Sequence, residues 1–516
     1  MKNTIVKIIA LFLLAGAFRI SFNNNFFWVD EFSTATQAQL LLEHGSDIFN
    51  QSSNYFEAHN ITTHLITAGS FFLFGFGEWQ AKLPMMLLGS FIPVLIYIFA
   101  KKIFNKNTAL VASLLSIFSY WQITWSRQAR GYVLQQLLVL LTLLCYQLLL
   151  KKFSKPRLFF LITVSLFGLL THTTYILILL ALGVHFILFN REKVMGVVTK
   201  PLFLISAAFL LLLASYTGQL SIITDNLKIL IGYHPNNLAY YHSFLWREQT
   251  IISLLAFLGT LLIFFKKKKY SLGSLLLLPV ILYLFFVSFL FAPYVSRYLL
   301  PIFPLLIVLS GMAVSEIAAL ISKKQQLLIS AMIVLFIVIN GDKFTIKPKA
   351  FYSVNHDMRE IALINYDQVY GIIESKGELE KGKTAVVDTW PDRIKWYLGE
   401  NQDYFYTFRW LDEPGTVNGL EKKTPFELNK EGEKYIPKTG RPPVKLIGEL
   451  LDLELAMAKY QQGFIWIDDS SLPADVISYA KENFYKELYL DHYPLDDNPY
   501  SIWPGTLYSW GFEANN

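Results

Sequence analysis

The sequence predicts an α-helical polytopic membrane protein with a C-terminal soluble α/β domain. Of its 516 residues, 53% are hydrophobic and only 16% charged, and the mean hydropathy is +0.39, whereas about a quarter of a typical soluble domain is charged. The apolar runs end near Asn340, where the charge also changes sign. Residues 1–340 carry a net charge of +15 and residues 341–516 carry −9. We therefore expect a membrane module over 1–340 and a soluble domain over 341–516.

The composition also excludes several classes of protein and site. The chain is too apolar for an ordinary soluble enzyme, a disordered chain or a coiled coil. Its single cysteine, Cys145, lies in an apolar run, which excludes disulfides, cysteine-based zinc sites and iron–sulfur clusters. The net charge of +6 is the sum of two opposite parts. The excess of basic residues in 1–340 is therefore a signal of membrane topology. It does not indicate that the protein binds nucleic acid.

The basic residues predict where the chain crosses the membrane, because they stay on the cytoplasmic side. A helix crosses ~30 Å of hydrocarbon with about 20 apolar residues. Because successive basic clusters lie on the same side of the membrane, the chain between them must cross an even number of times. The first span, with Lys2, Lys7 and Ala15-Gly16-Ala17, also fits a signal peptide, whose removal would leave later sidedness unchanged. We expect about eleven transmembrane (TM) helices, with the N-terminus cytoplasmic. They lie near residues 4–22, 83–100, 107–125, 132–150, 158–171, 174–190, 201–218, 249–265, 272–291, 298–315 and 326–340.

Two apolar segments test this topology. Residues 158–190 contain no Asp, Glu, Lys or Arg, yet both flanks are basic, so we expect two short helices that turn at residues 171–174. Residues 61–77 are apolar enough to cross, but a crossing there would place Lys101 and Lys102 outside. We expect this segment to form a helix in the outer interface.

The first outer segment, residues 22–82, concentrates acidic side chains. Asp30 and Glu31 follow the first span and are bracketed by Trp28 and Phe32. Partial shielding from water makes a carboxylate a stronger base than it is in bulk, so both are candidate catalytic residues. A solvated loop with aromatic interface anchors explains the same pattern equally well. The six acids of the segment are Asp30, Glu31, Glu43, Asp47, Glu57 and Glu78.

Outer arginines are few, which makes each of them informative. Arg127 and Arg130 precede Tyr132 and are three residues apart, so helical spacing puts them on one face. Two guanidiniums on one face suit a phosphate, which accepts forked hydrogen bonds. Arg297, next to Tyr298, would add a third cation. Alternatively, these arginines extend to lipid headgroups at the membrane surface. Their predicted position on the outer side, however, runs against the usual concentration of basic residues on the cytoplasmic side.

The histidines allow two interpretations. Glu57, His59 and His64 could bind a divalent metal, but the two histidines are five residues apart, not the four that suit one helical face. No cofactor is firmly implied, and a divalent metal stays open. We expect His172, at the turn near Tyr175, to cap a helix or line a cavity.

The soluble domain has the pattern of a small α/β unit. Strands are expected over 384–388 and 463–469, each followed by a helix, over 392–398 and 473–484. Pro414 to Pro443 is rich in Gly, Pro, Lys and Glu, so we expect an irregular excursion there. No glycine-rich phosphate loop is present.

Several segments together resemble the polyprenyl-phosphate-dependent glycosyltransferases of the GT-C superfamily. Within that superfamily the chain is similar to the protein O-mannosyltransferases (glycosyltransferase family 39-like) and to the aminoarabinose transferase of lipid A. The order and spacing of the motifs over residues 1–320 carry the resemblance. They are Trp28-x-Asp30-Glu31, His59, Phe74-Gly75, Lys82-Leu83-Pro84, Arg127-x-x-Arg130-x-Tyr132 and Arg297-Tyr298-Leu299-Leu300-Pro301. Asn60, Ile61 and Lys82 depart from the family pattern, which has Pro, Pro and Arg.

The resemblance implies an enzyme that moves a sugar from a polyprenyl-phosphate donor to an acceptor hydroxyl on a lipid, glycan or protein, with inversion. The expected location is the plasma (inner) membrane, where membrane lipids are further partners. The residues implied are listed by role: catalytic, Asp30 and Glu31; donor phosphate, Arg127, Arg130, Arg297, Tyr132 and Tyr298; acceptor or support, Glu57, His59 and His172.

Three other functions compete with this one. A lipid-linked sugar flippase or transporter also needs arginines and acids facing a cavity, but it would distribute polar groups through the membrane and show an internal repeat. An O-antigen ligase-like protein would have a large outer loop late in the chain. An inert membrane protein would use its outer domain only to bind a partner.

Overall fold

The computed structural model describes most of the chain, and its contacts divide into two compact units. Unit 1 comprises residues 1–19, 88–126 and 132–348, and unit 2 comprises 20–87, 127–131 and 349–516. The described residues are 2–20, 26–27, 29–45, 60–189, 236–265, 270–290, 295–341, 343–345, 364–377, 379, 383–399, 405–408, 415–417, 420–422, 426–436, 444–467, 473–490 and 505–512.

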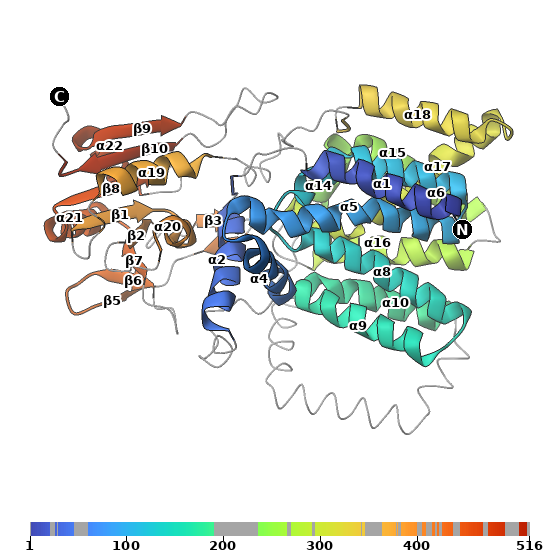
Figure 1. Cartoon of the computed structure of the whole chain (residues 1–516), viewed down its shortest axis with the longest axis horizontal. Coiled ribbons are helices and arrows are strands. Elements are labelled where there is room, and N and C mark those ends of the chain that lie inside the picture. Colours follow the sequence, from blue (N-terminus) through green and yellow to red (C-terminus); the bar gives the residue numbers. More distant parts are fainter. Residues whose placement is uncertain are drawn as a thin grey trace, which may run out of the picture. The chain divides into compact units, whose positions relative to one another are not determined.

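Unit 1 is built from apolar helices (Figure 1). They correspond to the predicted spans throughout the described residues, and the predicted span 201–218 lies outside them. The helices are α1 (Lys2–Ile20), α5 (Glu78–Ile103), α6 (Lys106–Phe118), α7 (Tyr120–Ser126), α8 (Tyr132–Lys151), α9 (Lys155–Thr171), α10 (Ile176–Phe189), α14 (Leu238–Arg247), α15 (Thr250–Phe265), α16 (Tyr270–Phe289), α17 (Phe303–Ile321) and α18 (Gln326–Asn340), with the 3-10 helices η2 (Thr173–Tyr175) and η4 (Ser296–Ile302). Ile20 and the first ten residues of α5, 78–87, belong to unit 2.

Length and composition identify the helices that suit a bilayer. Among the described residues, Glu78–Ile103, Tyr132–Lys151 and Ser296–Ile321 are long and apolar enough to cross, and the bent pair α14 and α15 would be a fourth. Within the described part of the chain, shorter apolar helices coincide with the spans predicted near 107–125, 174–190, 272–291 and 326–340. Helices α1 and α9 occupy the positions predicted for 4–22 and 158–171. These helices confirm a polytopic helical module.

Close helix packing in unit 1 depends on small residues. α17 lies against α6 and α15. A Cβ placed on Gly311 of α17 would come within 2.7 Å of the Ala112 Cβ in α6, and one on Gly259 of α15 within 2.2 Å of the Leu309 carbonyl oxygen. Larger side chains there would push the helices apart, as expected for helices that pack without a strong hydrophobic driving force.

Unit 2 contains a mixed sheet in the order β5-β6-β7-β2-β1-β8-β10-β9. Strands β7, β2, β1 and β8 are parallel, and the outer strands pair antiparallel. β1 is buried at every position, as expected for a strand covered on both faces. The strands are β1 (Thr384–Asp388), β2 (Phe405–Phe408), β5 (Glu427–Leu428), β6 (Lys434–Ile436), β7 (Val444–Ile447), β8 (Gln462–Ile467), β9 (Tyr485–Leu490) and β10 (Gly505–Trp510), and β3 (Gly415–Val417) pairs with β4 (Leu420–Lys422) separately.

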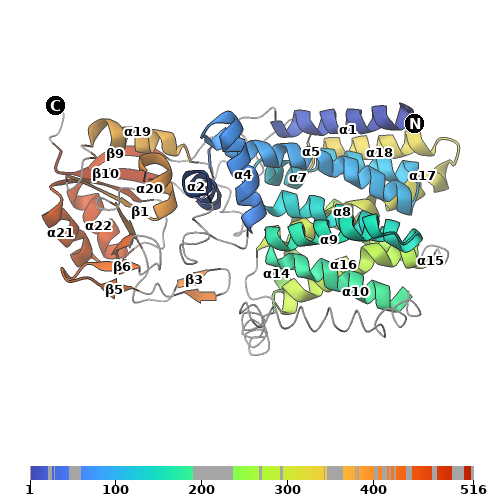
Figure 2. The ribbon, with the colours of Figure 1, turned by 60° about the horizontal axis from the view of Figure 1, so that its bottom comes forward.

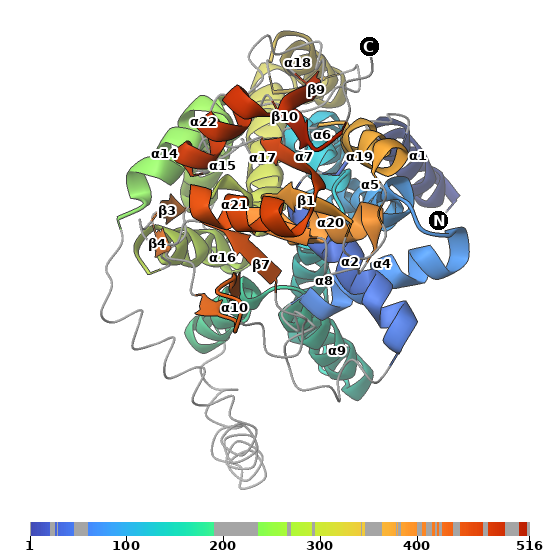
Figure 3. The same ribbon diagram turned by 90° about the vertical axis from the view of Figure 1, so that its left-hand side faces the viewer.

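Helices cover both faces of this sheet. α19 (Tyr366–Lys376) packs with α20 (Pro391–Leu398), and α21 (Leu450–Lys459) packs with α22 (Ala474–Asn483). Figure 3 shows the strands between the two pairs. The α/β prediction is confirmed. The irregular excursion expected between Pro414 and Pro443 is wrong in part, because β3 to β6 form short antiparallel pairs there.

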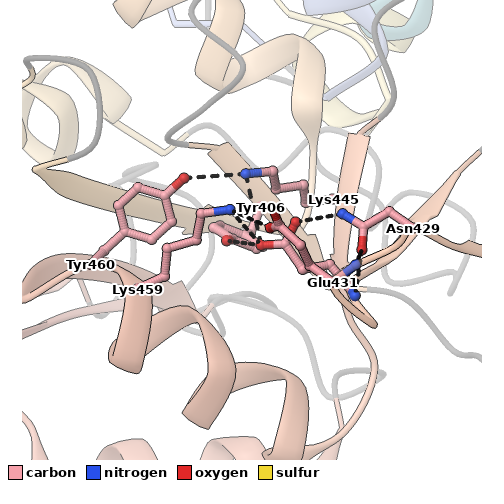
Figure 4. A network of polar contacts seen from close by, with 7 residues as sticks. Tyr406, Asn429, Glu431, Lys445, Lys459 and Tyr460 are labelled. Atoms are coloured by element: carbon pink, nitrogen blue, oxygen red, sulfur yellow. Dashed lines mark hydrogen bonds and ion pairs between the residues drawn. The ribbon is translucent and has the colours of Figure 1, made fainter.

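A polar network fastens the β5–β6 hairpin to the sheet and to α21 (Figure 4). Glu433 accepts hydrogen bonds from Asn429 at 2.8 Å and from Lys459 at 3.1 Å, and Lys445 lies 3.9 Å away. Burial alone would raise the pKa of Glu433, but Lys445 and the bonds from Lys459 and Asn429 hold it below its usual range.

The first outer segment belongs to unit 2. Helix α2 (Val29–His44) packs between α4 (Ile61–Phe74) and α20, and Figure 2 shows α2 beside α4. Phe32 is fully buried and contacts the rings of Phe27, Tyr366 and Tyr397. One hydrophobic core therefore includes both the first outer segment and the C-terminal domain.

Helix α4 is the segment expected in the outer interface. Its 14 residues extend ~21 Å, which is shorter than the ~30 Å of a bilayer core. Phe72, Leu73 and Phe74 at its C-terminal end are exposed. Helix α10 has the same length and coincides with a predicted span, so length does not distinguish the two cases, and the interfacial location of α4 stays a prediction.

Candidate active site

The candidate catalytic acids lie in the first turn of α2, where the positive end of the helix dipole favours negative charge. Glu31 is fully buried. Its Oε1 accepts a 2.6 Å hydrogen bond from the Ala129 backbone N–H, and its Oε2 lies 3.5 Å from the Lys82 ammonium. Glu31 therefore ties α2 to both α5 and the segment Arg127–Gly131.

Asp30 is more accessible than its neighbour. Its carboxylate lies 3.6 Å from the Arg130 guanidinium, and the side chains of Asp30 and Arg130 are 27% and 16% exposed. Arg130 also donates to the Asp30 carbonyl at 2.9 Å and to the Thr34 hydroxyl at 3.3 Å. The structure thus brings a partly exposed carboxylate and a cation together, as the sequence predicted for the first outer loop and the arginine pair.

Arg127 begins the segment that holds Arg130. Burial lowers the pKa of Arg127 to about 10, so the group stays cationic at neutral pH although it is partly desolvated. A desolvated cation gains more from an anionic ligand than a hydrated one does. The phosphate-binding role predicted for Arg127 stays a prediction.

Unit 1 brings together a second set of predicted residues. Arg297, in η4, is largely buried and donates through Nε to the Tyr132 hydroxyl at 3.0 Å. The rings of Tyr132 and Tyr298 lie 5.5 and 6.0 Å from the His172 ring. Gln136 of α8 donates to the Leu300 carbonyl at 2.7 Å, which fixes η4 to that helix.

His172 has the capping role that we expected. Its Nδ1 accepts from the Thr174 backbone N–H at 3.2 Å and lies 2.8 Å from the Thr174 hydroxyl. Thr174 also contacts Gln135 and Tyr283. His172 thus stabilises the turn between α9 and α10 and contributes a ring to the cluster around Tyr132.

Two predicted site residues, Glu57 and His59, lie outside the described residues, and so does Trp28 of the acidic motif. Within the part of the chain that the structure describes, no group of three or more His, Cys, Asp or Glu residues could hold a metal ion. The metal alternative stays a prediction.

Sequence reasoning missed two buried cations. Lys82 appeared only as a departure from a motif, yet it pairs with Glu31 and lies 5.5 Å from the centre of the Phe27 ring. Arg19, at the end of α1, is fully buried and donates to the Ser126 hydroxyl at 3.1 Å and the Ser116 carbonyl at 3.3 Å. For Arg19, an ionisable residue inside the span predicted over 4–22 was the available signal, whereas Lys82 precedes its predicted span and gave no such signal.

Comparisons with known proteins agree with the sequence resemblance. Residues 58–217 match the family model of dolichyl-phosphate-mannose-protein mannosyltransferase. No curated protein matches the sequence.

Solved structures show the same fold. ArnT from Cupriavidus metallidurans in the apo state is 12% identical with a TM-score of 0.60, and the match covers 98% of each chain. The same protein bound to undecaprenyl phosphate is 12% identical with a TM-score of 0.53, over 100% of this chain and 99% of that one.

The oligosaccharyltransferase of Archaeoglobus fulgidus is 12% identical with a TM-score of 0.52, over 78% of this chain and 62% of that one. These matches show the fold, and together with the family match they support a GT-C superfamily glycosyltransferase. The helices and the family also place the chain in a membrane.

Proposed function

We propose that this chain transfers a sugar from a polyprenyl-phosphate donor to an acceptor hydroxyl with inversion at the anomeric carbon. The observation that carries the proposal is the ion pair between Asp30 and Arg130, on the segment that also holds Arg127. A base for the acceptor and cations for the leaving phosphate are the two groups that this reaction needs.

Asp30 acts as the general base. As the acceptor oxygen attacks the anomeric carbon from the face opposite the phosphate, its proton passes to the Asp30 carboxylate. The bond between the anomeric carbon and the phosphate oxygen breaks, and its electron pair leaves with the polyprenyl phosphate. Arg127 and Arg130 stabilise the negative charge that develops on that oxygen. Arg297, Tyr132 and Tyr298 are further donor-binding residues in this proposal.

Glu31 has a positioning role. Its carboxylate is fully buried and already engaged by Lys82 and Ala129, so it orients the segment that carries the arginines. Glu57, His59 and His172 are proposed to support the acceptor side.

The partners follow from the same reaction. The donor is a lipid-linked sugar, and the acceptor is a lipid, glycan or protein hydroxyl. We propose that the chain lies in the plasma membrane with its N-terminus in the cytoplasm and its C-terminal domain outside. The distribution of basic residues supports this orientation.

Purified protein and polyprenyl-phosphate-linked sugars, including the mannose form, test the proposal. Asp30→Asn should lower transfer by at least 10³-fold while the protein stays folded, because the acceptor proton loses its base. Glu43→Gln, an exposed change on the same helix, is the matched control.

Arg127→Ala and Arg130→Ala should raise the donor KM or lower kcat far more than they affect the acceptor, whereas the exposed Arg247→Ala should change neither. Near-normal turnover in Asp30→Asn would remove Asp30 as the base. Movement of the intact donor across vesicles without transfer would favour the flippase alternative.

A further inference from the structure

A cavity in unit 2 is lined by residues to which the proposed function above assigns no role. Its volume is about 330 Å³, or roughly eleven times the ~30 Å³ that a water molecule occupies in the liquid, so it has room for a group the size of a hexose. It lies where the start of α5 meets α19 and α20. Its described lining residues are Gly77, Glu78, Trp79, Gln80, Asp367 and Trp396.

The lining combines flat apolar surfaces with hydrogen-bonding groups. Trp79 and Trp396 supply indole rings, which offer a broad apolar face and one N–H donor each. Glu78 and Asp367 supply carboxylates, and Gln80 supplies an amide. A sugar ring has the matching surface, with C–H bonds on its faces and hydroxyl groups around its edge.

The cavity is held in shape by its surroundings. The Trp396 ring lies 5.2 Å from the Phe27 ring and 5.9 Å from the Phe71 ring. Glu78 Oε1 accepts a 2.6 Å hydrogen bond from the Tyr397 hydroxyl. Pre-placed aromatic and polar groups lower the free energy needed to order a site on binding.

Glu78 has unused hydrogen-bonding capacity. Its buried Oε2 has no hydrogen-bond partner among the described residues, and a buried acceptor in that state costs free energy that a ligand hydroxyl would recover. The exposed Asp367 carboxylate repels a phosphate. The cavity therefore suits a neutral or amino-bearing sugar and disfavours the phosphate end of the donor.

The cavity lies in the same unit as the candidate base, and residues beside that base in the sequence contact its walls. Lys82, one helical turn after Glu78, pairs with Glu31, and Phe27 contacts Trp396 three residues before Asp30. We propose that this cavity is an acceptor subsite that binds a sugar ring of the acceptor. Its role as an acceptor subsite rests on the proposed transferase function, whereas its affinity for sugar does not.

The test measures sugar binding to the full chain in detergent, independently of transfer. Methyl glucoside and glucosamine serve as the neutral and amino-bearing probes, and saturation-transfer NMR gives their Kd. Trp79→Leu and Asp367→Asn should each weaken binding at least tenfold. The matched controls are the exposed Trp246→Leu in α14 and the exposed Glu374→Gln on the same helix as Asp367, which should leave the Kd unchanged.

The outcomes separate this inference from the proposed function. The inference is overturned if neither probe binds the wild type, or if both cavity variants keep the wild-type Kd while transfer continues. The protein could bind a sugar in a way that depends on Trp79 and Asp367 and yet show no transfer activity. That outcome would support the sugar site and refute the proposed function. Asp367 is exposed, so Asp367→Asn should fold normally. This variant can therefore test the inference even if Trp79→Leu does not fold.

Discussion

Removing the Glu31 carboxylate tests whether that residue positions the site. Glu31 is fully buried beside Lys82, whose side chain is 5% exposed, and it also accepts from the Ala129 N–H. Glu31→Leu therefore leaves a buried ammonium without its counter-ion and a buried N–H without its acceptor. Breaking one side of a buried ion pair costs about 3–5 kcal/mol.

That cost predicts a measurable shift in thermal stability. Unit 2 comprises roughly 240 residues, and about 1 kcal/mol shifts the Tm of a domain that size by about 2–4 °C. Glu31→Leu should thus lower the apparent Tm in detergent by about 6–20 °C at a fixed scan rate. Glu43→Gln, on the same helix but exposed, should stay within about 2 °C.

The double variant decides whether the pair is coupled. Glu31→Leu with Lys82→Met removes both charges, so it should lower the apparent Tm by less than the sum of the two single variants. If the Tm loss of the double variant equals the sum of the losses of the two single variants, the two side chains do not form a coupled buried ion pair. Asp30→Asn should lose transfer without a comparable loss of Tm, because Asp30 is partly exposed.

Three further results are expected. Arg393→Met should lower the apparent Tm of the full chain by several degrees because it leaves the buried Asp388 without its ion-pair partner; an unchanged Tm would contradict this. Because the pKa of Glu433 is held below its usual range, the stability advantage of the wild type over Glu433→Gln should be full above about pH 5 and disappear as the pH falls through that lowered pKa. An advantage that stays constant in urea titrations from pH 7 to 3 would count against it. Tyr132→Phe removes the hydroxyl that accepts a hydrogen bond from Arg297 and should raise the donor KM about tenfold. Equal donor KM values for the wild type and the variant would show that this contact does not contribute to donor binding.

The sequence predicted the helical module well because hydropathy and basic clusters are strong, local signals. The hairpin at residues 171–174 followed from charge alone, and the structure places the end of α9 and the cap His172 there. The first strand and the following helix of the soluble domain were also predictable, since Thr384–Asp388 is buried throughout and Pro391 starts the next helix.

Partners far apart in the sequence were not predictable. Asp30 and Glu31 are adjacent and chemically alike, yet one is partly exposed beside Arg130 and the other is buried against Lys82. Only the fold distinguishes them. The cavity residues Glu78, Asp367 and Trp396 come from three separate segments, so no local pattern could have grouped them.

The shared core of unit 2 has a consequence for biosynthesis. Phe32 is synthesised more than 300 residues before Tyr366, whose ring it contacts. At about 5–20 residues per second, the helix that carries Asp30 waits roughly 20–70 seconds for the residues that cover it. Most members of that core lie at residues 364–510, so a chain that terminates before them leaves the apolar side of α2 uncovered.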